Sequence, residues 1–216
     1  MNKVIISVCD DFTKQIIIHC VKAVNPKLEI IDGSNDTDII YHLKSAEDDI
    51  VFFDKFFLGY VLSYKMKSLR VYNKKLRIVF CEQGNCSRFF GIRVYDLKAD
   101  GFISHIENNR EFADKLRLIL SGQRIFPEEV MMSLKGNEHL RYSRYCSEIT
   151  EQEFEIGLLL GLGKSIKEIA FITNLTTGTV ASYISRLKNK IGFESMNDFF
   201  VLNGQMEKIN IRSWNC

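Results

Sequence analysis

Proline is scarce in this sequence, and long apolar runs are missing. Two prolines and 13 glycines among 216 residues argue against extended disordered linkers and collagen-like repeats. No apolar run approaches the ~20 residues that a helix needs to cross a bilayer, which excludes a membrane-spanning helix. Two acidic residues, Asp10 and Asp11, directly follow the first apolar run. We therefore expect no signal peptide and a cytoplasmic protein.

The residue spacings that mark zinc sites are also missing. The six cysteines form no Cys-x-x-Cys pair, and the four histidines form no His-x-x-x-His pair. We expect reduced thiols, because a protein without an export signal stays in a reducing compartment. A thiol sensor at Cys81 or Cys86 would need basic neighbours that lower the thiol pKa, and the sequence indicates none.

Neither sign of charge dominates the chain. It has 29 basic and 27 acidic residues and a net charge of +2, so no overall basic field indicates a nucleic-acid partner. Affinity for nucleic acid must then come from the local placement of charge. The length suits two small domains or one large one. We predict a first domain at residues 1–122, a linker at 123–146 and a second domain at 147–216.

Short apolar runs alternate with amphipathic stretches over the first 122 residues. The runs are rich in β-branched residues and too short for helices, so they indicate buried strands. Five strands that alternate with five helices predict an α/β fold with a doubly wound parallel sheet. The predicted strands span residues 3–8, 28–31, 49–54, 77–81 and 101–104.

Polar or reactive side chains stand at the ends of four of these strands. Asp10 and Asp11 follow the first, Asp54 ends the third, Cys81 ends the fourth, and His105 follows the fifth. Such side chains meet at one edge of a parallel sheet, where ligands bind. Three carboxylates suit Mg²⁺, and an aspartate beside a metal can attack a phosphoryl donor. The alternative is that these acids only face solvent at strand ends.

Residues 1–122 resemble the receiver domain of bacterial response regulators. The resemblance rests on the acidic pair Asp10-Asp11, on Asp54, on Gly59, and on the Ala-Asp-Gly-Phe sequence at 99–102. It implies that the acidic pair holds Mg²⁺ together with Asp54, and that Asp54 accepts phosphate.

Two positions depart from the receiver pattern. Cys81 stands where the family has Thr or Ser, and a thiol is a weaker hydrogen-bond donor to a phosphoryl group than a hydroxyl. His105 stands where the family has Lys, and imidazole is shorter and largely neutral at pH 7. We therefore expect the receiver fold without an efficient phosphorylation cycle, in a domain that serves dimerisation or sensing.

The predicted linker contains one helix signal. Pro127 followed by Glu128 and Glu129 favours a short helix, with proline at the first position and acids in the first turn. We interpret residues 123–146 as a tether between domains; a regulated hinge or a dimer contact is the alternative.

Local signals define three helices in the last seventy residues. Capping boxes at Thr150–Glu153 and Ser165–Glu168 each predict the start of a helix, and a third helix is predicted over 177–191. A further cap at Ser195 predicts a fourth, so the second domain should be all-α. A tight turn at 173–176 makes the arrangement a helix-turn-helix, whose later helix enters the major groove of DNA.

The third predicted helix carries a local basic stripe. Between 176 and 190 there are three cations and no acid, with hydroxyls near the helix start and an apolar stripe that includes Val180, Ile184, Leu187 and Ile191. Hydroxyls and amides at a helix start suit phosphate oxygens. The predicted DNA-binding residues are Thr177, Thr179, Val180, Ser182, Tyr183, Arg186, Lys188 and Lys190, with Lys167 on the preceding helix.

Residues 149–200 resemble the LuxR-type helix-turn-helix found in regulators of the NarL and LuxR class. The matching motifs are Ile149-Thr150-x-x-Glu153, Gly163-x-Ser165-x-Lys167-Glu168-Ile169-Ala170, Thr179-Val180 and Lys190-Ile191-Gly192. The resemblance implies a DNA-binding transcriptional regulator, and receiver followed by this domain is the usual order in the family. Ala181 and Tyr183 stand where the family commonly has Lys and His, so we expect modest affinity for DNA.

The sequence therefore predicts a transcriptional regulator without enzyme activity. Its partners are expected to be double-stranded DNA and either a second copy or a related regulator. Three alternatives stay open: an accessory subunit that lends promoter choice to a related regulator, a phosphorylatable regulator or phosphotransfer protein that uses Asp54, and an interaction module that has lost DNA binding. The absence of acids between 176 and 190 argues against the last.

Overall fold

A computed structural model describes residues 3–33, 36–43, 48–54, 62–84, 86–104, 106, 109–135 and 149–191. All five predicted strands are present close to their predicted bounds. They are β1 (Lys3–Ser7), β2 (Glu29–Asp32), β3 (Ile50–Phe53), β4 (Arg77–Cys81) and β5 (Gly101–Ile103). Within this part of the chain, no helix combines the length and hydrophobicity that a membrane crossing requires.

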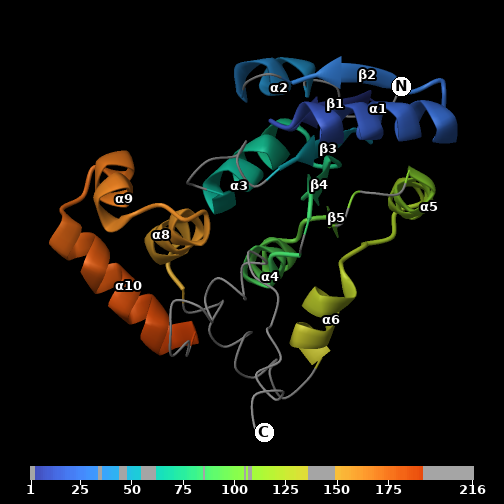
Figure 1. Cartoon of the computed structure of the whole chain (residues 1–216). Helices are drawn as coiled ribbons and strands as arrows, with labels where there is room; N and C mark the ends of the chain where they lie inside the picture. Colours follow the sequence, from blue (N-terminus) through green and yellow to red (C-terminus); the bar gives the residue numbers. More distant parts are fainter. Residues whose placement is uncertain are drawn as a thin grey trace, which may run out of the picture.

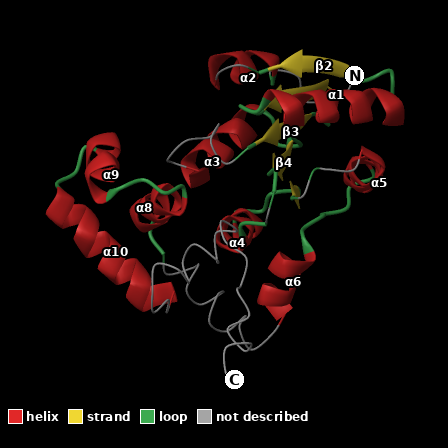
Figure 2. Cartoon of the chain, in the orientation of Figure 1, coloured by secondary structure: helices red, strands yellow, loops and turns green. Residues whose placement is uncertain are grey.

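The strands form one parallel sheet, which confirms the predicted fold class. Their order is β2-β1-β3-β4-β5 (Figures 1 and 2). The strand order reverses between β1 and β3, whose residues Ser7 and Phe53 lie opposite each other. In open parallel sheets, ligands bind just beyond the strand ends at such a reversal.

Helices cover both faces of the sheet. Alternate residues of each strand point to opposite faces, and the apolar side chains on both faces are buried by helices. Val4, Ile6 and Phe52 pack under α1 and α5. Ile5 and Phe53 belong to the core on the other face, under α2, α3 and α4. The helices of this half are α1 (Asp11–Val24), α2 (Asp36–His42), α3 (Leu62–Tyr72), α4 (Arg88–Asp96) and α5 (Asn109–Leu120).

The beginning of the predicted linker packs against the sheet domain. Ile125 pairs with Gly101 beside β5. The guanidinium of Arg124 lies over the Tyr95 ring at 4.4 Å, and its Nε donates to the carbonyl of Ala99 (3.0 Å). The short helix predicted after Pro127 is present as α6 (Glu128–Lys135), which packs on α4. Residues 136–148 lie outside the described residues.

The second half contains α8 (Glu151–Gly161), α9 (Ile166–Thr173) and α10 (Thr177–Ile191). Both predicted capping boxes form. Gly163 (φ 77°) and Asn174 (φ 53°) adopt left-handed conformations that end α8 and α9, as glycine and asparagine do at low cost. The predicted fourth helix after Ser195 lies outside the described residues, as do Gly59 and His105.

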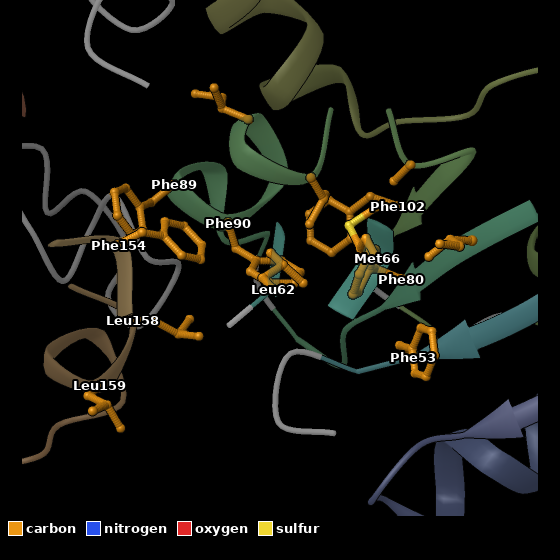
Figure 3. Packing of buried hydrophobic residues seen from close by; sticks show 14 of the residues in the cluster. Phe53, Leu62, Met66, Phe80, Phe89, Phe90, Phe102, Phe154, Leu158 and Leu159 are labelled. Carbon is orange, nitrogen blue, oxygen red and sulfur yellow. The ribbon is translucent and has the colours of Figure 1, made fainter. Parts of the chain in front are cut away.

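The two halves share one hydrophobic core, which the sequence does not predict. Phe154 of α8 stacks on Phe89 of α4, with ring centroids 5.0 Å apart, and also lies 6.5 Å from Phe90 (Figure 3). Gly157 permits the close approach, because a Cβ there would lie 2.8 Å from Leu187 and 3.1 Å from Phe89. Arg93 of α4 pairs with Glu151 at the start of α8. The second half is thus docked on α4.

Replacing Phe154 with alanine should weaken both halves of this core. We expect Phe154→Ala to lower the free energy of unfolding by about 3–5 kcal/mol, as for other buried aromatic residues. Phe171→Ala is the matched control, because that side chain is 90% exposed on α9 and should change stability by less than about 0.5 kcal/mol. Chemical denaturation of the two variants measures both values. Equal stability of the two variants would contradict the shared core.

Candidate nucleic-acid interface

Helix α10 is anchored along one side. Its first turn is capped by Thr176, whose Oγ1 accepts a hydrogen bond from the backbone N–H of Thr179 (3.1 Å). The predicted apolar stripe packs toward α8 and α9, with Val180, Leu187 and Ile191 buried and Ile184 half-buried. In Figure 1, α8 lies between α10 and the sheet domain. The opposite side of α10 is therefore left for solvent or a ligand.

That opposite side is polar and free of acids. Residues of an α-helix follow one another at about 100°, so Ser182, Ser185 and Asn189 lie opposite the stripe, and all three are exposed. Arg186 and Lys188 are exposed on either side of them. No Asp or Glu occurs between Thr177 and Ile191. Hydroxyls, an amide and cations gathered in this way can donate to phosphate oxygens and base edges.

The start of α10 adds backbone donors to this surface. The first N–H groups of a helix have no partner within the helix and carry a partial positive charge. Thr177 and Gly178 are exposed at this end, while Thr179 Oγ1 lies 2.8 Å from Thr176 Oγ1. Lys167 is exposed on α9. We refer to Thr177, Ser182, Ser185, Arg186, Lys188 and Asn189 as the reading face.

A second candidate site lies at the carboxyl ends of β1, β3 and β4. A cavity of about 440 Å³ is lined by residues that include Cys9, Asp10, Asp54, Cys81 and Glu82. Asp54 is buried, and its Oδ2 accepts a hydrogen bond from the backbone N–H of Cys9. The Cys9 thiol is also hydrogen-bonded to Asp54, and its pKa is raised, first by burial and then by that carboxylate. Asp54 is thus already hydrogen-bonded at both the backbone and the thiol of Cys9.

Comparison with known proteins identifies the second half directly. Residues 147–202 match the family described as "Bacterial regulatory proteins, luxR family". Residues 147–202 therefore form a luxR-family domain, and the chain as a whole is similar to LuxR-type response regulators. Proteins of this family regulate transcription and are not enzymes.

Two relatives and one solved structure are similar to this chain over different shares of its length. The Fimbriae Z protein of Escherichia coli K12 is 26% identical over 174 residues, 80% of this chain and 82% of that protein. The response regulator protein VraR of Staphylococcus aureus is 30% identical over 99 residues, 46% of this chain and 47% of VraR. The structure of RcsB from Salmonella enterica serovar Typhimurium superposes with a TM-score of 0.64 at 18% identity, over 95% of this chain and 99% of RcsB.

The magnesium ligands expected of a receiver are not assembled in this one. Asp10 caps α1, where its Oδ2 accepts the Thr13 N–H (2.6 Å), and these hydrogen bonds lower its pKa. Asp11 is exposed in the first turn of α1. Among the described residues, no three His, Cys, Asp or Glu side chains lie together as a metal would require. Asp10 and Asp54 line the same cavity but do not form a three-ligand cluster with Asp11 among the described residues, and Mg²⁺ binding stays a prediction.

The thiols of the receiver half do not support a redox sensor. Cys81 is fully buried at the end of β4, where burial, and then the Asp54 charge, raises its pKa far above the usual value. Burial likewise raises the pKa of Cys86 to about 12. Reactive cysteines need a lowered pKa, because the thiolate is the nucleophile. The Cys81 side chain is therefore neutral and a weak hydrogen-bond donor.

Two of the predicted DNA-binding residues do not lie on the exposed side of α10. Val180 is fully buried, so it supports α10 from within the core. Lys190 Nζ donates to Glu153 Oε2 (2.6 Å), and this carboxylate also accepts the Thr150 N–H (2.9 Å). Residues four apart rotate by about 40° around a helix, so the row that starts at Ser182 turns toward α8 by Lys190. Lys190 therefore joins the end of α10 to the start of α8.

Sequence reasoning missed two exposed members of the reading face, Ser185 and Asn189. Neither residue is charged, so a pattern of basic residues does not identify them. Counting 180° from Val180 and Leu187 around the helix would have found both. The other predicted members, Thr177, Ser182, Arg186 and Lys188, are exposed, and Thr179 and Tyr183 are half-buried.

The two lysines near the end of α10 allow a direct comparison of structural and surface roles. Lys190→Met leaves the buried Glu153 carboxylate without its cation, which should lower the free energy of unfolding by about 3 kcal/mol. Lys188→Met makes the same change at an exposed position and should cost less than about 0.5 kcal/mol. Thermal and chemical denaturation measure the difference. Similar values for the two variants would contradict the structural role of Lys190.

Glu155 on α8 should make stability depend on pH. Burial raises its pKa to about 7, against a usual value of 4.5, and the neighbouring Glu151 adds to the shift. The folded protein then binds this proton more tightly than the unfolded chain, so this group lowers stability as pH rises from about 4.5 through 7. Glu155→Gln should raise Tm at pH 8 and have less effect at pH 5.

A carboxylate on the surface provides the control for Glu155. Glu29→Gln removes the same charge from an exposed position on β2. Its effect on Tm should be small and similar at pH 5 and pH 8. If Glu155→Gln gives the same profile as Glu29→Gln, the Glu155 carboxyl is not buried in solution as described.

Proposed function

We propose that this response regulator controls transcription by binding double-stranded DNA through the reading face of α10. The observation that carries the proposal is the exposed, acid-free side of α10, with Arg186 and Lys188 beside three small polar residues and the helix start. Such a helix enters the major groove, where its early residues meet base edges and phosphates. The site of action is then the cytoplasm, where a bacterial chromosome lies.

The structural relatives support this function. RcsB structures that share the fold were solved bound to promoter DNA, one with rprA (TM-score 0.64) and one with P1flhDC (TM-score 0.58). Another holds two RcsB dimers on two parallel DNAs, with a TM-score of 0.54. The luxR family match covers α10 itself.

We also propose that phosphorylation of Asp54 is not required for this binding. The carboxylate of Asp10, one of the predicted magnesium ligands, caps α1 by accepting the Thr13 N–H. A neutral, buried thiol at Cys81 is a poor donor to a phosphoryl oxygen. The docking of α8 on α4 already leaves the reading face exposed. The receiver-like half then holds the DNA-binding half in place and supplies a surface for pairing.

Binding is proposed to involve two chains. One helix-turn-helix covers one half-site, and such regulators gain affinity and site length by binding two half-sites a helical turn apart. The second chain is either another copy or a related regulator. The modest number of cations on the reading face, Arg186 and Lys188, favours reliance on such a partner.

The test is selective recovery of DNA by the purified, untreated protein. It is mixed with a pool of genomic duplex fragments at two salt concentrations, and the bound fragments are sequenced. We expect a restricted set of fragments, with weaker recovery at the higher salt because phosphate contacts displace counterions. Failure to recover any fragment selectively would contradict autonomous DNA binding.

Matched lysine variants locate the DNA-binding surface. Lys188→Ala should weaken binding to the recovered fragments and reduce the slope of log affinity against log salt by about one. Lys22→Ala removes an exposed lysine at the end of α1, far from α10 along the chain, and should leave binding unchanged. Equal effects of the two variants would show that DNA is not bound by α10.

A further inference from the structure

One contact on the reading face involves an aromatic ring. The guanidinium carbon of Arg186 lies 4.6 Å from the centre of the Tyr183 ring, one helical turn earlier on α10. This distance is within the range of a cation–π interaction, in which the ring face attracts the guanidinium. Within the described part of the chain, Arg186 makes no ion pair or hydrogen bond. The Tyr183 ring is thus the contact that the described residues offer to the Arg186 guanidinium.

The ring itself is held by the core. Tyr183 is half-buried and packs, together with Ile184, against the core that α10 shares with α8 and α9. An aromatic ring has two rotatable bonds, whereas an exposed arginine has many rotamers to lose on binding. Because the core fixes the Tyr183 ring, contact with the ring can order the exposed Arg186 side chain before DNA binds.

The other two cations of α10 are not arranged in this way. Lys190 is held by the buried carboxylate of Glu153 and faces α8. Lys188 is exposed on the far side of the reading face from Tyr183, and it has no aromatic contact with the described residues. Arg186 also carries a planar set of donors, which a lysine lacks. Among the described cations of α10, Arg186 is therefore the one whose position and donor geometry suit a bidentate hydrogen-bond contact.

We propose that Tyr183 positions Arg186 to read a guanine in the major groove. Arginine can donate two hydrogen bonds to the O6 and N7 acceptors of guanine, which is the commonest base-specific contact in protein–DNA complexes. This inference rests on the proposed DNA-binding function and adds to it a base and a positioning residue. Tyr183 acts through Arg186, so its own phenolic hydroxyl is dispensable.

Three substitutions at these positions test the pairing. Tyr183→Phe keeps the ring and should bind a recovered genomic fragment within twofold of the native affinity. Tyr183→Leu keeps an apolar side chain but removes the ring face, and should weaken specific binding about two- to fivefold, the range expected for an exposed cation–π contact. Arg186→Ala should weaken it about five- to 150-fold, as for the loss of a bidentate base contact.

A double substitution separates positioning from packing. In the Arg186→Ala background, Tyr183→Leu should cause no further loss, because the ring then has nothing to position. If Tyr183→Leu lowers affinity equally with and without Arg186, the ring has only a packing role and the inference is overturned. Melting temperatures of all variants are measured alongside, and affinities are compared after correction for the folded fraction.

The kind of contact is tested with a duplex of scrambled sequence. A base contact predicts that Arg186→Ala lowers affinity for the recovered fragment more than for the scrambled duplex. Equal losses on both duplexes, with a salt slope shallower by about one, would assign Arg186 to phosphate and overturn guanine reading. In a recovered fragment, 7-deazaguanine in place of the contacted guanine should abolish the difference between native protein and Arg186→Ala.

Failure of this inference is distinguishable from failure of the proposed function. If DNA is not bound at all, Lys188→Ala has no effect to measure, and the proposed function itself fails. If Lys188→Ala weakens binding while Tyr183→Leu behaves like Tyr183→Phe, the protein binds DNA and only the positioning role is wrong.

Discussion

The arrangement of the whole chain depends on a series of aromatic contacts that crosses from the sheet to α8. Phe80 of β4 meets Phe90 of α4 edge-on at 5.2 Å, Phe90 lies 6.5 Å from Phe154, and Phe154 stacks on Phe89 (Figure 3). Aromatic rings bury large areas and favour defined relative orientations. Through these contacts, α8 packs against both the sheet domain and the other helices of the second half. Helix α10 packs on the side of α8 away from the sheet domain (Figure 1), and its polar side stays exposed.

The carboxylate of Glu153 joins the start of α8 to the end of α10. Glu153 closes the capping box of α8 and also accepts the Lys190 ammonium group from the end of α10. The Lys190 cation and the hydrogen bonds from Thr150 together hold its pKa below the usual value, although burial alone would raise it. The start of α8 thus fixes both the contact with α4 and the direction of α10. The position of the reading face in this structure follows from these two contacts.

Features that depend on local chemistry could be predicted from the sequence. The five strands follow from short β-branched runs, and the start of α10 follows from the turn that ends at Thr176. The docking of α8 on α4 could not be predicted, because the sequence does not show which surfaces pack together when the two halves are far apart along the chain, as Phe89 and Phe154 are. The prediction that Lys190 binds DNA came from the pattern of basic residues on the helix. That pattern cannot show that Glu153, 37 residues earlier in the chain, pairs with Lys190. The DNA contacts themselves stay predictions, as do the domain bounds.

The central claim is that the reading face is competent without phosphorylation of the receiver-like half. The most direct test is the affinity of the full-length protein for a recovered genomic fragment, measured with and without Mg²⁺ and a small phosphodonor. We predict that the two dissociation constants agree within twofold, because the docking of α8 on α4 already exposes α10. A tenfold or greater gain in affinity on treatment would contradict this account and would place Asp54 in control of DNA binding.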